Sequence, residues 1–224
     1  MARLTPGGRF RSLPIVLLLL TLFSAAVGCR NLATLAVYMI RGTNVRAEHP
    51  GLKDTTTVVV CRPVASLAFR DTGVSHDLAR RISSLLGQRV KKINVIDSQE
   101  VAAWLDERFD SDYSFPEVGH AFHADRVVGI ELSEFDLYKG QTLYQGKATV
   151  RVVVYDLTEN DRIAFERELP RIVWPPNVGV PTGEREKSEF RRQFLGVVAD
   201  HIGRYFYEHD PYTDYAQDAA ALQY

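Results

Sequence analysis

The stretch that decides the fold is Ala124–Leu157, ADRVVGIELSEFDLYKGQTLYQGKATVRVVVYDL. In its second half apolar and polar side chains alternate, with Ala148, Val150, Val152 and Val154 set against Lys147, Thr149 and Arg151. A period of two predicts an antiparallel strand with one buried face. Lys139-Gly140-Gln141 separates the two halves, and Gly140 is free to take the positive φ of a tight turn. The stretch therefore predicts two long strands joined in a hairpin.

The first half of this stretch changes its alternation part-way along. Two sets of apolar residues fall on opposite parities: Val128, Ile130 and Leu132, then Phe135 and Leu137. One extra residue in a strand, a β-bulge, returns both sets to a common face. We expect such a bulge near Ser133 or Glu134.

The segments around the hairpin predict a mixed sheet covered by helices. We expect strands at residues 55–61, 93–96 and 161–169, and helices at 74–86, after the cap Asp97, at 115–124 and at 188–209. Gly87 and Asp210-Pro211 are expected to end the first and last of these helices. The element order is then β-α-β-α-α-β-β-β-α, an α+β fold with antiparallel hairpins in a mixed sheet and helices packed on it.

Composition restricts the class of protein. The chain has 224 residues, of which 46% are hydrophobic and 25% charged, and these values suit one globular domain with tails. The net charge is −1 and no basic stripe is present, so nucleic acid is not expected as a partner. The two cysteines, Cys29 and Cys61, do not amount to a disulfide framework.

The amino terminus has the features of an export signal. Arg3, Arg9 and Arg11 precede an apolar run, Leu13–Val27, which is shorter than the roughly 20 residues that span a bilayer. The run ends in Ala26-Val27-Gly28-Cys29, which resembles the lipobox of bacterial lipoproteins, where small residues precede a cysteine that accepts diacylglycerol. This resemblance implies cleavage before Cys29 and an anchor of acyl chains on it. The alternatives are an uncleaved signal anchor, or a secretory signal in which Cys29 is incidental.

The chain is therefore expected to have four parts. Residues 1–28 form the signal peptide and 29–54 a lipid-anchored apolar segment with a linker. Within the second part, residues 31–40 either lie in the membrane interface or pack on the domain. Residues 55–209 form a single α+β domain, and 210–224 an acidic, disordered tail. Arg30 rather than Asp follows the lipidated cysteine, which by the sorting rule of bacterial lipoproteins favours the outer membrane.

The junction Val118–Gly129, VGHAFHADRVVG, carries a family resemblance. It is similar to a pattern in bacterial envelope proteins: the curli secretion-channel lipoprotein, lipoprotein activators of penicillin-binding proteins, and the amino-terminal domain of TolB. Asp125 would cap backbone groups at the turn, and Gly129 would let a helix approach the strand. The resemblance implies a mixed sheet with helices on it, used for binding and assembly in the envelope, with no catalytic residues to transfer.

Few residues suggest chemistry. Cys61 is expected to be a small buried hydrophobe rather than a reactive thiol. His120 and His123 are spaced to share one helical face, but no further ligand lies nearby, so neither a metal nor a cofactor is expected. Glu131 and Glu134 are expected to be solvated charges. The alternative, a hydrolase with paired carboxylates, would require both in one cleft.

The long loop Pro170–Gly183 is the candidate partner surface, centred on Trp174-Pro175-Pro176. Long irregular loops in compact domains are often functional. The alternative is that Trp174 packs onto the sheet edge. The predicted function is a lipid-anchored, non-catalytic binding or assembly protein on the periplasmic face of the bacterial envelope, which holds a protein partner by this loop or by a sheet edge. One alternative is a structural envelope subunit that forms oligomers, including homo-oligomers. The other is an envelope hydrolase, for which no catalytic residue is assigned.

Overall fold

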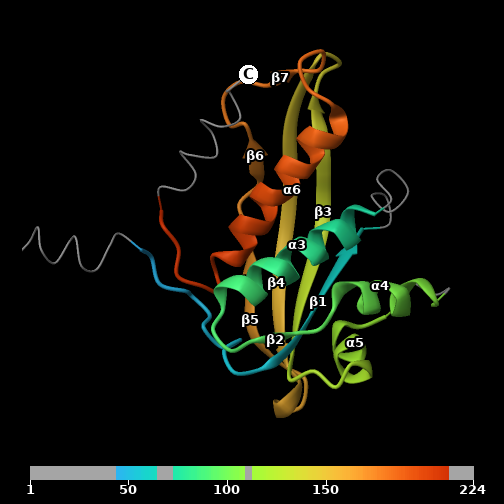
Figure 1. The fold of residues 1–224 in the computed structure, drawn as a ribbon, viewed down its shortest axis with the longest axis vertical. Helices are drawn as coiled ribbons and strands as arrows, with labels where there is room; N and C mark the ends of the chain where they lie inside the picture. Colours follow the sequence, from blue (N-terminus) through green and yellow to red (C-terminus); the bar gives the residue numbers. More distant parts are fainter. Residues whose placement is uncertain (1–43, 65–72, 109–112, 212–224) are drawn as a thin grey trace, which may run out of the picture. The chain divides into compact units, whose positions relative to one another are not determined.

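A mixed sheet forms the centre of the domain (Figure 1). The computed structural model describes residues 44–64, 73–108 and 113–211. Its strands run in the order β2-β1-β3-β4-β5, and β6 and β7 pair with a further length of β4. The strands are β1 (Thr56–Pro63), β2 (Asn94–Val95), β3 (Arg126–Lys139), β4 (Leu143–Asp156), β5 (Arg162–Glu168), β6 (Ile172–Trp174) and β7 (Val180–Pro181). Strand β1 is parallel to β2 and β3, and all other pairs are antiparallel.

The helices are α3 (Val74–Arg89), α4 (Ser98–Asp106), α5 (Phe115–Ala121) and α6 (Lys187–Gly203), with a short 3-10 helix η1 (Leu157–Glu159). The predicted fold class and element order are confirmed, with two short strands added. The predicted signal peptide at 1–28, the lipidation site Cys29, the apolar segment and most of the tail lie outside the described residues.

The hairpin β3–β4 is confirmed as the longest strand pair. Its register shifts between Leu132 and Glu134, at the predicted bulge, and again between Asp136 and Tyr138. Phe135 and Leu137 thereby join Leu132 in the core, at 7%, 3% and 0% exposure. Gly140 takes φ +69° in the turn, as its lack of a Cβ permits.

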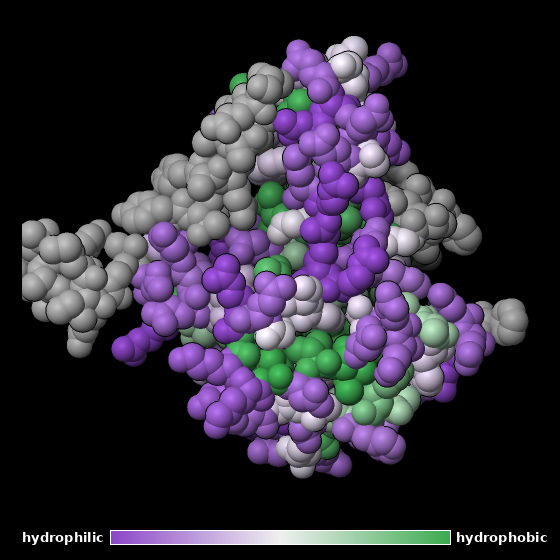
Figure 2. Space-filling view, viewed as in Figure 1, coloured by the Kyte–Doolittle hydropathy of each residue, from purple (hydrophilic) through white to green (hydrophobic). Residues whose placement is uncertain are grey.

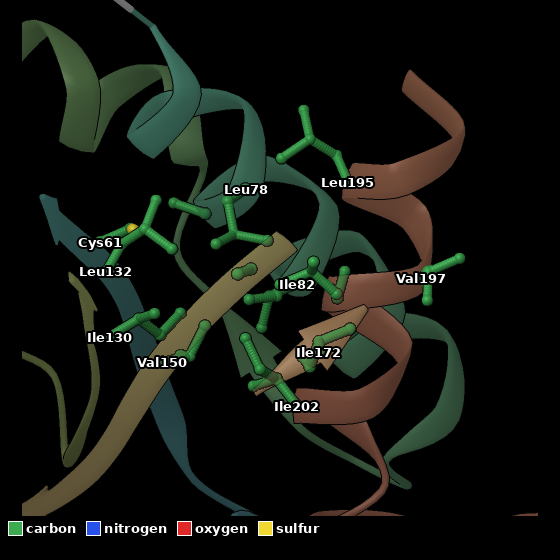
Figure 3. Close-up of a cluster of buried hydrophobic side chains, with 14 of the residues drawn as sticks. Cys61, Leu78, Ile82, Ile130, Leu132, Val150, Ile172, Leu195, Val197 and Ile202 are labelled. Carbon is green, nitrogen blue, oxygen red and sulfur yellow. The ribbon is translucent and has the colours of Figure 1, made fainter. Parts of the chain in front are cut away.

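Each face of the sheet has its own cluster of buried apolar side chains. Alternate residues of β1 enter different clusters, so that Val59 and Cys61 face α3 and α6, while Val58 and Val60 face α4 and α5. Figure 3 shows the larger cluster, in which Leu78 and Ile82 of α3 and Ile202 of α6 meet side chains of the hairpin strands. Burial of these side chains is the main favourable contribution to folding.

Residues 45–54, predicted to belong to the linker, pack on the domain. The backbone of Val45 exchanges two hydrogen bonds with His209, at 2.8 and 3.1 Å. The His49 ring stacks on Phe165 with 5.1 Å between centroids, and Leu52 is completely buried. The described chain therefore begins beside the segment that follows α6.

The predicted ends of α3 and α6 are wrong. Helix α3 passes Gly87 and ends at Arg89, because a single glycine costs a helix only about 1 kcal/mol. Helix α6 ends at Gly203, before the predicted end at His209. The ring of Tyr207 folds back onto Gly203, where a Cβ would lie 2.7 Å from the Tyr207 Cε1 atom. Gly203 therefore lets the chain reverse direction there.

The loop 170–183 is less irregular than predicted, because it contains β6 and β7. Strand β5 pairs with β4 only from Arg151 to Asp156. The earlier part of β4 is therefore left with a free edge, and β6 and β7 pair with it at residues 146–148 and 143–144.

The junction that carries the family resemblance joins β1, β3 and α5. Asp125 Oδ2 accepts a hydrogen bond of 2.7 Å from the backbone N–H of Thr56, so it caps the neighbouring strand rather than its own turn. A Cβ on Gly129 would lie 2.6 Å from Cδ2 of Phe115, which confirms that this glycine allows α5 to approach the strand. Gly119 similarly leaves space for Val127 and Leu157.

Candidate functional site

The three residues of the predicted partner surface differ in their exposure to solvent. Trp174 is only 4% exposed, and its ring centroid lies 5.3 Å from that of Phe190 on α6. Pro175 is also buried, and its carbonyl accepts a 2.9 Å hydrogen bond from Gln145 Nε2. Pro176 is exposed. Trp174 thus takes the alternative position, packed on the sheet, and neither it nor Pro175 is presented to a partner by this loop.

The exposed part of the loop follows Pro175. Val178 has 58% of its surface exposed, more than the other exposed large hydrophobic residues in the described part of the chain. Strand β7 pairs with Leu143 and Tyr144, which brings the loop to the end of the sheet where the β3–β4 turn lies (Figure 1). We call this end the distal surface and define it by Tyr138, Gly140, Pro176, Asn177 and Val178.

Aromatic and basic groups surround Tyr138, at one side of the distal surface. The Tyr138 side chain is 36% exposed, and its ring lies 5.3 Å from that of Tyr144 between centroids. Lys187 Nζ, at the start of α6, lies 5.7 Å from the centroid of the Tyr138 ring. Lys147 Nζ donates a 3.2 Å hydrogen bond to the Tyr138 carbonyl. Asp136 Oδ1 accepts a 3.0 Å hydrogen bond from the Tyr138 backbone N–H, so groups of both charges surround the exposed Tyr138 side chain, a composition that suits a contact with another protein.

The distal surface and the start of the described chain lie at opposite ends of α6. Lys187 begins this helix beside Tyr138, whereas His49 bonds to Tyr205 just beyond its last residue, Gly203. A helix of 17 residues is about 25 Å long. Any segment that precedes Val45 therefore enters the domain about 25 Å from the distal surface.

A second apolar surface lies at the edge of the sheet formed by β2. Figure 2 shows hydrophobic side chains gathered around β2, below α3. The partly buried residues of this segment are Ile93, Val95 and Ile96. Strand β2 pairs with β1 alone among the described strands, so its outer edge is a second place where a chain segment can add to the sheet.

Glu131 and Glu134 of β3 lie in ion pairs on the face of the sheet that α5 partly covers. Glu131 accepts hydrogen bonds from Arg62 at 2.9 Å and from Arg151 at 2.7 Å. Partial burial raises the pKa of Glu131, but the two arginines outweigh it, so the net pKa lies below the usual value. Arg171 likewise lowers the pKa of Glu134, by hydrogen bonds to its carboxylate. Carboxylates held ionised by separate arginines are poor proton donors at neutral pH, which does not favour the paired-carboxylate hydrolase.

This network predicts a pH-dependent contribution to stability. The pKa of Glu131 is lower in the folded state, so its contribution is full above the unfolded pKa, about 4.3, and is lost as pH falls through the folded pKa. We expect Glu131→Gln to lower the free energy of unfolding by about 0.5–1 kcal/mol at pH 7 and by nearly nothing at pH 3. Urea denaturation at both pH values measures this. An equal loss at both would show that packing, not charge, is responsible.

His120 and His123 do not share a helical face, and Cys61 is buried. Helix α5 ends at Ala121 and His123 takes φ +51°, so the prediction that His120 and His123 share a helical face is wrong. His120 Nε2 instead lies 2.8 Å from Asp161 Oδ1. Within residues 44–64, 73–108 and 113–211, no three His, Cys, Asp or Glu side chains are grouped to hold a metal ion. Cys61 is 4% exposed, and burial raises the pKa of its thiol to about 12, as expected of a buried hydrophobe.

Comparisons with known proteins give fold likenesses of low identity. No protein-family model matches the chain, and no curated protein matches it in sequence. A PelC dodecamer from Paraburkholderia phytofirmans is similar at TM-score 0.44 and 10% identity, over 74% of this chain and 96% of that one. The lipoprotein GNA1162 from Neisseria meningitidis gives 0.41 and 12%, over 66% and 96%. The LpoB C-terminal domain from Salmonella enterica gives 0.35 and 12%, over 62% and 93%.

Within the part of the chain that the structure describes, no helix combines the length and the apolar character needed to cross a bilayer.

Proposed function

We propose that this chain is a lipid-anchored, non-catalytic binding or assembly protein on the periplasmic face of the bacterial envelope, with the outer membrane favoured. The acyl chains on Cys29 hold it at the membrane, and the distal surface binds a protein partner. The observation that carries the proposal is the position of Val178 and Tyr138, exposed at the end of α6 opposite the start of the described chain.

The geometry of a tether supports this assignment. Residues 29–44 reach at most about 55 Å when fully extended. Within the described residues, the length of α6 puts about 25 Å between the start of the domain and the distal surface. A surface presented in this way is accessible to a partner in the periplasm.

Membrane attachment is tested at Cys29. We expect Cys29→Ala to move the protein from the membrane fraction to the soluble fraction, since one lipidated residue supplies the anchor. Cys61→Ala is the matched control, because Cys61 is a buried thiol within the domain, and it is expected to leave the protein in membranes. Unchanged membrane retention of Cys29→Ala would contradict lipidation at this residue.

Partner binding is tested by site-specific crosslinking in intact cells. A photoreactive amino acid at position 178 is expected to give a discrete adduct, and Tyr138→Ala to lower its yield about tenfold, because exposed aromatic residues dominate binding energies. Position 163 is the matched control, since Ile163 is 47% exposed on the edge strand β5. Position 94 on β2 tests the second apolar surface. Adducts at 94 or 163 without one at 178 would reject the distal surface as the binding site.

A further inference from the structure

Strand β2 forms one edge of the sheet, and its outer side is unpaired among the described strands. The backbone N–H groups of Asn94 and Ile96 each donate a 2.9 Å hydrogen bond to a carbonyl group at the start of β1, so these two residues face the sheet. Because backbone groups alternate in direction along a strand, the N–H and C=O groups of Ile93 and Val95 point away from the sheet. Both residues therefore offer a backbone donor and a backbone acceptor to a further strand.

The segment that forms this edge is apolar and carries no charge. Residues 93–96, INVI, contain three large aliphatic side chains and one asparagine, and hydrophobic side chains gather around β2 (Figure 2). The edge formed by β5 differs, because four of its residues are charged: Arg162, Glu166, Arg167 and Glu168. Charges along an edge strand oppose its pairing with another strand. Of these two edges, β2 is therefore the better suited to receive a strand.

Exposed residues of opposite charge flank this segment along the chain. Lys91 and Lys92 precede it, and Asp97 and Glu100 follow it. Asp54 lies 3.7 Å from Lys92 and offsets part of the positive charge, whereas Lys91 lies in no ion pair within the described residues. If two copies pair as antiparallel strands, the basic end of each segment meets the acidic end of the other, which is favourable. A parallel pair would bring like charges together, so the charges favour the antiparallel arrangement.

The direction of the backbone groups also restricts the register of such a pair. Only residues whose backbone groups point outward can exchange hydrogen bonds, so Ile93 and Val95 must lie opposite odd-numbered residues of the second copy. One register sets Ile93 opposite Val95 of the second copy, which pairs apolar side chains at both positions and places Asn94 opposite itself. The next allowed registers set Ile93 opposite Asp97, or Val95 opposite Lys91, of the second copy. The segment is therefore self-complementary in a single register.

We propose that two copies of this chain join through β2 as antiparallel strands, about a two-fold axis at Asn94, so that one sheet runs through both. Ile93 and Val95 of each copy exchange backbone hydrogen bonds with Val95 and Ile93 of the other. The axis is perpendicular to the sheet, so the two distal surfaces lie at opposite ends of the dimer and stay exposed. This interface is independent of lipidation and of partner binding at the distal surface.

A disulfide at the two-fold axis tests this pairing. Facing residues at a position without backbone hydrogen bonds have Cα atoms about 4.5 Å apart, within reach of a disulfide. In the full chain in detergent micelles, Cys29→Ala removes a competing thiol, and the remaining Cys61 is buried. In this background Asn94→Cys is expected to form a disulfide-linked dimer under mild oxidation. Lys92→Cys is the control: the residue is exposed, but it would lie about 13 Å from its own counterpart, so we expect its dimer at least about tenfold more slowly.

A charge reversal separates this pairing from random collision. Adding Lys91→Glu to Asn94→Cys is expected to slow disulfide formation about threefold to tenfold, because like charges then meet at both ends of the paired segment. Lys139→Glu makes the same change of charge at an exposed residue of the β3–β4 turn, and is expected to leave the rate unchanged.

Three results would overturn the proposal. The first is an equal rate of disulfide formation at positions 94 and 92. The second is a rate at position 94 that Lys91→Glu leaves unchanged. The third is a photocrosslink from position 94 in intact cells that captures a different protein and not a second copy, because another chain would then occupy this edge.

Discussion

Replacing Phe194 by alanine is expected to lower the free energy of unfolding by about 3–5 kcal/mol. Phe194 of α6 is completely buried, and its ring centroid lies 5.4 Å from that of Phe135 on β3. A Cβ on Gly146 of β4 would overlap the same ring, so the strand and the ring are closely fitted. Loss of the ring leaves a cavity that the rigid sheet cannot close. Denaturation in urea measures the change.

Two further variants separate this packing from general hydrophobicity. Ile163→Ala removes a large apolar side chain that is 47% exposed on β5, and we expect a change within about 0.5 kcal/mol. Gly146→Ala alone is expected to destabilise the domain, whereas adding it to Phe194→Ala is expected to cost less, because the new methyl group enters the vacated space. Additive losses would show that the two residues do not share one packing site.

Gly129→Val is expected to destabilise the domain by about 3 kcal/mol, at the upper end for overpacked cores. A Cβ at this position would lie 2.6–2.8 Å from three ring atoms of Phe115, and β3 cannot move away without disturbing its pairing with β1. Thermal or urea unfolding measures the effect, and Phe115→Leu in the same chain is expected to recover part of it.

Gly87→Ala is the matched control for this glycine. A Cβ on Gly87 of α3 would lie 3.9 Å from Val95 Cγ2, which is ordinary van der Waals contact. Alanine is expected to raise stability by up to about 1 kcal/mol through its higher helix propensity. Equal losses at Gly87 and Gly129 would contradict the close approach of α5 as the cause.

The hairpin was predictable because its information is local. Alternation of apolar residues placed the strands, and the parity change after Leu132 located the bulge before any partner strand was known. The sequence indicated that a helix approaches the strand closely at Gly129. It did not identify Phe115 as the contacting residue, because that depends on how α5 packs on the sheet.

Other features depend on contacts between distant segments. The end of α6 follows from Tyr207 packing on Gly203, while the apolar periodicity continues past it. Strands β6 and β7 form because β5 leaves part of β4 unpaired. Trp174 packs against Phe190 and is buried. The exposed apolar residue of the loop is instead Val178, whose neighbouring residues in the sequence do not indicate its exposure. Local patterns indicate which residues are apolar, but not which of them the tertiary structure leaves at the surface.

The pairing of Val45 with His209 determines how the domain responds to mechanical load. A pulling force applied through the residues before Val45 acts first on its two hydrogen bonds to His209 and then on the bond from His49 to Tyr205. These bonds break one after another, whereas the β1–β3 and β3–β4 ladders share a load among many. Under tension the first residues of the domain would therefore detach before the sheet unfolds, and this short segment would limit the force that reaches the sheet.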